Sequence, residues 1–121
     1  MTFTATDLPD VRRFTATCAA RAGMSAEAAD DFVIAVNEIT TNAVRHGSPR
    51  AWLRLWVAGA ALVAEVRDTG RWPAESVPAA LPSRPAEQGG MGLEVARLVC
   101  DGLQIKAGSG GTAVLLRMTL R

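Results

Sequence analysis

The chain has 121 residues, a formal net charge of +1 and 49% hydrophobic residues. This length fits one domain, so we expect residues 1–121 to form a single unit. A charge so close to neutral does not indicate nucleic acid or an anionic membrane as the main partner. No apolar run approaches the about 20 residues of a membrane span, and the N-terminus lacks the pattern of a signal peptide. We therefore expect a cytoplasmic location.

The first predicted helix covers residues 8–22, with Asp7 placed to cap it and Gly23 placed to end it. Its apolar positions recur at helical spacing and predict one buried stripe, formed by Val11, Phe14 and Cys18.

The two cysteines, Cys18 and Cys100, belong to no CxxC pair and to no Cys/His cluster. This spacing makes a structural zinc site unexpected, and a reducing compartment disfavours a disulfide. Since both lie in apolar helical patterns, we expect them to be small buried core residues.

A second helix is predicted to begin after Ser25 and to end near Gly47. Glu38 and Asn42 lie beside its apolar stripe, on a flanking face. The stripe itself consists of Phe32, Val36, Ile39 and Ala43.

The remaining chain predicts two hairpins separated by a loop and a helix. Alternating residues over 52–57 and 62–66 indicate an antiparallel pair, and residues 103–107 and 112–120 indicate another. Four prolines mark residues 70–90 as a loop, and a glycine-rich start leads into a helix that ends near Gly102. We therefore expect an α+β two-layer sandwich, a mostly antiparallel sheet with helices packed on one face.

The pair Glu38 and Asn42 is the first candidate site. Residues four apart lie on neighbouring turns of one helix face. An asparagine amide oxygen is a hard ligand that suits Mg²⁺, and a nearby carboxylate can orient or deprotonate a nucleophile. A solvated helix face explains the same spacing.

Three glycine-containing stretches are further candidates. Asp68 ends a strand, and Gly70 follows it where a planar base can approach the backbone. Gly90 and Gly92 precede a helix whose N-terminal amides can hold phosphates. Thr112 opens the last strand after the turn "GSGG". Taken singly, these features are better explained by a turn, a flexible helix cap and a hairpin loop.

In chain order the motifs are "NEITTN", "DTG", "GMGL" and "GT". In this order and spacing the sequence resembles the GHKL (Bergerat-fold) ATPases, over roughly residues 8–120. It is most similar to the bacterial anti-sigma-factor serine/threonine kinases, because "AVNEITTNAVRHG" matches their N box nearly throughout.

The resemblance implies that ATP and Mg²⁺ are the cofactors, with Asn42 as the metal ligand and Glu38 as the general base. Asp68 is then the residue that reads the adenine amine, and residues 71–90 form the ATP lid. His46 is expected to have a structural role or to contact phosphate, and Arg45 to face the nucleotide or a partner. The further nucleotide-binding positions are Gly70, Gly90, Met91, Gly92, Leu93 and Thr112.

The function implied is a protein kinase that binds a sigma factor and phosphorylates an anti-anti-sigma (STAS-type) antagonist. The alternative is a non-catalytic module, with or without nucleotide, that sequesters a partner protein. Trp72 occupies the position of the second glycine in the "DxGxG" pattern of many relatives, and the lid is rich in proline. Relatives are often homodimers, but no feature of the sequence decides the oligomeric state. The catalytic half of a two-component histidine kinase is disfavoured, because nothing resembles an acceptor helix.

Overall fold

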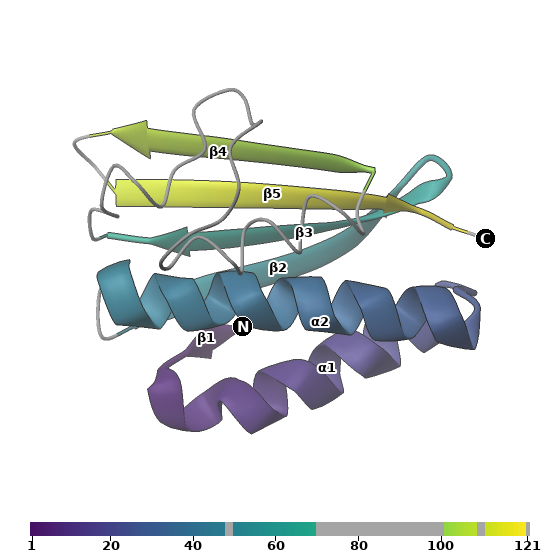
Figure 1. Ribbon diagram of the computed structural model, residues 1–121, viewed down its shortest axis with the longest axis horizontal. Coiled ribbons are helices and arrows are strands. Elements are labelled where there is room, and N and C mark those ends of the chain that lie inside the picture. Colours follow the sequence, from purple (N-terminus) through teal and green to yellow (C-terminus); the bar gives the residue numbers. More distant parts are fainter. Residues whose placement is uncertain (48–49, 70–100, 109–110, 121) are drawn as a thin grey trace, which may run out of the picture.

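The structure of the protein is a computed structural model that describes residues 1–47, 50–69, 101–108 and 111–120. These residues form an α+β fold, as predicted (Figure 1). In chain order the elements are β1 (Thr2–Phe3), the 3₁₀ turn η1 (Ala5–Asp7), α1 (Leu8–Arg21), α2 (Ala26–Asn42), the π-helical turn η2 (Ala43–Gly47), β2 (Ala51–Ala58), β3 (Ala61–Asp68), β4 (Gly102–Gly108) and β5 (Gly111–Thr119).

The described strands form one antiparallel sheet in the order β1-β2-β3-β5-β4. Both α1 and α2 lie on the same side of this sheet (Figure 1), which confirms the two-layer arrangement. Strand β1 was not predicted. Two residues are too short to show an alternating pattern, and β1 exists only because Thr2 and Phe3 pair with Trp52 and Ala51.

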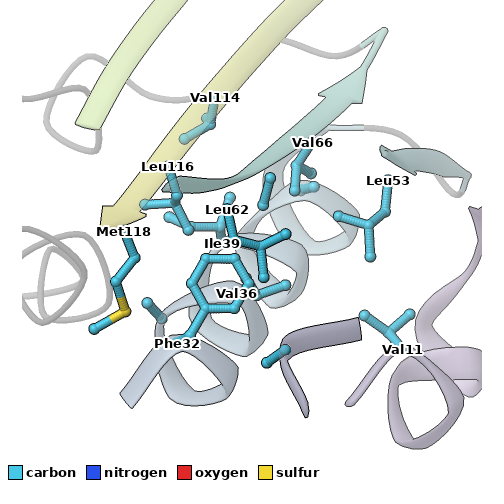
Figure 2. Packing of buried hydrophobic residues seen from close by; sticks show 14 of the residues in the cluster. Val11, Phe32, Val36, Ile39, Leu53, Leu62, Val66, Val114, Leu116 and Met118 are labelled. Carbon is cyan, nitrogen blue, oxygen red and sulfur yellow. The ribbon is translucent and has the colours of Figure 1, made fainter. Parts of the chain in front are cut away.

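Helix α2 follows its predicted pattern closely. The side chain of Ser25 accepts a hydrogen bond from the amide of Ala28 at 3.1 Å, which satisfies one of the free N–H groups of the first turn. The predicted stripe is buried: Phe32, Ile39 and Ala43 are 0% exposed and Val36 is 1% exposed. Figure 2 shows Phe32, Val36 and Ile39 packed against sheet residues that include Leu62 and Leu116.

Helix α1 has a different buried stripe from the one predicted. Its buried residues are Val11, Thr15 and Ala19, whereas Phe14 is 39% exposed. The buried residues form an i, i+4 row, and Thr15 is compatible with burial because its hydroxyl donates to the carbonyl of Val11 at 2.8 Å. The phase of the stripe was therefore predicted wrongly.

Two smaller expectations also changed. Asp7 makes no side-chain cap of α1; its carboxylate instead accepts a hydrogen bond from the amide of Thr4 at 3.0 Å and so closes η1. Cys18 is half-buried rather than buried, because it lies beside the Thr15 and Ala19 stripe and not within it. Cys100, the lid and the third predicted helix lie outside the described residues.

Candidate functional site

One end of the sheet carries a buried polar pair. Asp68, the last residue of β3, pairs directly with Thr112 near the start of β5, and the two are 4% and 3% exposed. Two residues earlier along the ladder, Val66 pairs with Val114 in the core. Because side chains alternate along a strand, Asp68 and Thr112 face the helix layer just beyond these valines. The polar pair therefore continues an apolar row.

Glu38 and Asn42 lie at this same end of the fold. Asn42 is the last residue of α2, and η2 continues the helix to Gly47, only a few residues before β2 begins at Ala51. Ala51 pairs with Asp68 in the next strand. Figure 1 shows the C-terminal end of α2, the end of β3 and the start of β5 on one side of the molecule. All four chemically distinctive residues thus belong to one end.

The flank of α2 that carries Glu38 and Asn42 is turned away from α1. Asn37 marks the opposite flank, because its side-chain oxygen accepts a hydrogen bond from Arg12 of α1 at 3.1 Å. Each residue advances a helix by about 100°, which puts Glu38 and Asn42 on the other side of the core stripe. Glu38 is half-buried there and Asn42 is 5% exposed.

The helix changes to π geometry directly after Asn42, over Ala43–Gly47. Single π turns are uncommon and occur often at functional sites, because they rotate the following side chains relative to the helix. Arg45 in this turn is exposed, and the backbone of His46 belongs to the same turn. This irregularity was not predicted, and it directly follows the candidate metal ligand.

Gly111 is a feature that the sequence patterns did not single out. Its φ is +127°, and a Cβ built there would lie 2.1 Å from the carbonyl oxygen of Asp68. Only glycine permits the backbones of β3 and β5 to approach so closely at this point. The "GT" dipeptide, residues 111–112, already marked this point in the sequence, but a role was predicted only for its threonine.

The donor set suits a cation that is bound together with phosphate. In the ranges that the structure describes, no group of three or more His, Cys, Asp or Glu side chains is placed to hold a metal ion. Mg²⁺ needs no such cage, since it usually takes one or two protein ligands and completes its shell with water and phosphate oxygens. The buried amide of Asn42 is a fitting ligand of that kind.

Several predicted positions remain expectations. Gly70, Gly90, Met91, Gly92, Leu93 and Trp72 lie outside the described residues. The strand end with Asp68 and Thr112 and the helix end of the candidate site are therefore described, and the predicted phosphate turn is not.

The chain belongs to the family of histidine kinase-like ATPase domains, whose model matches residues 1–118. The match covers both the α2 segment and the Asp68 and Thr112 ladder. ATP is the ligand that this family implies. No curated protein sequence matches the chain significantly.

Solved structures with the same fold come from larger proteins. The RsbU and RsbW domains of Rv1364c from Mycobacterium tuberculosis match with a TM-score of 0.68 and 24% identity, over 99% of this chain and 32% of that one. A blue-light activated histidine kinase, EL346 from Erythrobacter litoralis, matches with a TM-score of 0.62 and 24% identity, over 80% and 32%. The histidine kinase domain of EL346 matches with a TM-score of 0.63 and 21% identity, over 93% and 59%.

These likenesses show the fold, and the chain spans only part of the length of each of those proteins. No helix within the described ranges has the length and apolar character needed to cross a membrane.

Proposed function

We propose that the chain is an ATP-dependent serine/threonine protein kinase of the anti-sigma-factor type, which binds a sigma factor and phosphorylates an anti-anti-sigma antagonist. The observation that carries this proposal is the meeting of two sets of residues at one end of the fold. The buried Asp68 and Thr112 pair ends the sheet, and the flank of α2 with Glu38 and Asn42 ends the helix layer. The first set suits a nucleobase, and the second suits phosphates.

Asp68 is an acceptor at a buried strand end, which suits the exocyclic amine of adenine. Asn42 would hold Mg²⁺, which neutralises phosphate charge when it is bound. Phosphoryl transfer depends mainly on such positioning and charge neutralisation. We assign the general base to Glu38: as the serine or threonine oxygen bonds to the γ-phosphorus, its proton passes to the Glu38 carboxylate, and ADP leaves with the bridging oxygen.

A second candidate function is a non-catalytic module of the same family that sequesters a partner. Trp72 favours it, because a tryptophan stands where many relatives have the second glycine of the motif, beside the predicted lid. This module either keeps ATP as a structural ligand or has lost it.

The deciding experiment is calorimetric titration of ATP with and without Mg²⁺. Asn42→Ala is compared with the native chain, and Asn37→Ala is the matched control because it removes the same amide from the opposite flank of α2. We expect Mg²⁺-dependent binding that Asn42→Ala loses and Asn37→Ala retains. Native protein that is folded but binds no ATP would remove the kinase proposal.

Transfer of labelled γ-phosphate to candidate antagonists then separates the two functions. The kinase requires transfer that Glu38→Gln abolishes while ATP binding persists. ATP binding with no transfer to any antagonist would favour the non-catalytic module.

A further inference from the structure

The outer face of the sheet, which is turned away from α1 and α2, carries aromatic side chains. Leu53, Val66 and Val114 point into the core, so the residues next to them in each strand face outward. On this outer sheet face Trp52 is 40% exposed, and Trp56 is half-buried. Single exposed apolar residues are ordinary, but Trp52 and Trp56 lie four positions apart on the same face of β2, with only Arg54 between them on that face, and so belong to one surface.

The outer sheet face is also strongly basic. Among the described strand residues, its charged side chains are one acidic, Glu65, and four basic, which leaves a surplus of three positive charges. The basic residues are Arg54, Arg67, Lys106 and Arg117. Among the described residues, the ion pairs of this face converge on Glu65, which lies 3.5 Å from Arg54 and 4.0 Å from Arg67. The single negative charge is thus already compensated.

Part of this surface is preorganised for contact. The guanidinium of Arg54 lies over the Trp56 ring, 5.0 Å from its centroid, and is also paired with Glu65. A side chain that is held in place before binding loses less entropy when a partner arrives. Tryptophan and arginine are the residues that most often dominate binding energy at protein interfaces.

We propose that the outer sheet face docks an acidic polypeptide segment of a partner protein. Its carboxylates would pair with the basic side chains, and an apolar residue of the segment would cover Trp52. Two copies that pair symmetrically through this face fit poorly, because each would bring the same positive surplus against the other. Nucleic acid is disfavoured because the whole chain has a net charge of only +1. The inference goes beyond the proposed kinase function and does not depend on nucleotide.

The test uses a fluorescein-labelled peptide of alternating glutamate and leucine as the probe. Anisotropy measures its affinity, and chemical shifts of ¹⁵N-labelled protein locate it. We expect shifts in the indole N–H signals of Trp52 and Trp56. Trp52→Ala, and separately the double variant Lys106→Glu/Arg117→Glu, should weaken binding by about tenfold or more. Arg117→Lys keeps the charge and should bind like the native chain.

Two variants of α1 serve as matched controls. Phe14→Ala removes an aromatic side chain that is 39% exposed, against 40% for Trp52, and Arg13→Glu reverses an exposed charge. Both should leave peptide affinity unchanged. A lysine–leucine peptide should not bind.

Three results would overturn the proposal. The first is that the peptide changes the chemical shifts only of residues away from the outer sheet face. The second is tight binding of poly(U) without binding of the acidic peptide. The third is self-association in sedimentation that Trp52→Ala abolishes while the acidic peptide does not bind.

Discussion

Asp68 and Thr112 are direct cross-strand partners at the end of β3 and the start of β5, and both are buried. They are 44 positions apart in the chain, but the ladder brings their backbones side by side. Because they face the helix layer, a ligand bound between sheet and helix would meet a carboxylate and a hydroxyl together. Substitution of these residues can therefore test whether this end of the fold binds nucleotide.

Asp68→Asn should lower the preference for ATP over GTP. The substitution keeps size, but it replaces a charged acceptor that suits the amine of adenine with an amide that can also donate to the guanine oxygen. Hydrogen bonds to charged groups contribute about 1.5–3 kcal/mol, so ATP affinity should fall by about tenfold or more. Parallel calorimetric titrations with ATP and GTP measure this change.

Glu65→Gln is the control for Asp68→Asn, since it neutralises a carboxylate of the same strand on the outer sheet face. It should leave both nucleotide affinities unchanged. Equal losses in the two variants would argue against a specific role for Asp68.

Gly111→Ala should destabilise the fold more than Gly59→Ala does. Both glycines have positive φ, at +127° and +61°, but a Cβ at Gly111 would meet the Asp68 carbonyl at 2.1 Å while one at Gly59 meets nothing within 4 Å. Gly59→Ala should therefore cost about 1–2 kcal/mol from backbone strain alone. Gly111→Ala should cost several kcal/mol, since β3 and β5 must separate locally. Urea denaturation of the two variants gives the comparison, and equal costs would contradict the close approach.

Ile39→Ala should lower the free energy of unfolding by about 2–5 kcal/mol, because Ile39 is 0% exposed and its removal leaves a cavity. Ile34→Ala is a control in the same helix with the same change of side chain, and Ile34 is 50% exposed. It should cost no more than about 0.5 kcal/mol. Chemical denaturation distinguishes the two. Similar costs would mean that the phase of α2 is wrong.

The Cys18 thiol should make stability fall at alkaline pH. Burial raises the pKa of this thiol above its ordinary value of 9.0, and the nearby positive charge of Arg21 opposes the rise. The folded chain therefore holds the proton more tightly than the unfolded chain. This contribution to stability is complete below the unfolded pKa and is lost as pH rises through the folded pKa.

Urea denaturation across alkaline pH tests this. The parent carries Cys100→Ser, and the variant compared with it carries Cys18→Ala in addition. The parent should lose more stability than the variant as pH rises. Folded Cys18 should also react with a thiol reagent more slowly than the unfolded chain does. An equal or faster rate in the folded protein would contradict the raised pKa.

Local sequence patterns predicted much of the fold. The spacing of Phe32, Val36 and Ile39 predicted the buried face of α2, and Ser25 predicted its start. Alternation predicted the hairpin strands now described as β2 and β3. Local patterns predicted the wrong buried face in a helix where two rows of residues could each be buried. In α1 the row containing Val11 and Thr15 is buried, and Phe14 is left exposed.

For the candidate site, the sequence by itself determined that Glu38 and Asn42 share one face of a helix, because i, i+4 spacing is a property of the helix alone. Only the tertiary structure decided that Asp68 pairs with Thr112, that Gly111 must lie against the Asp68 carbonyl, and that β1 exists. The physical reason is that periodicity arises within one element. Strand order and register instead depend on which distant segments can pair while burying a common apolar face against α2.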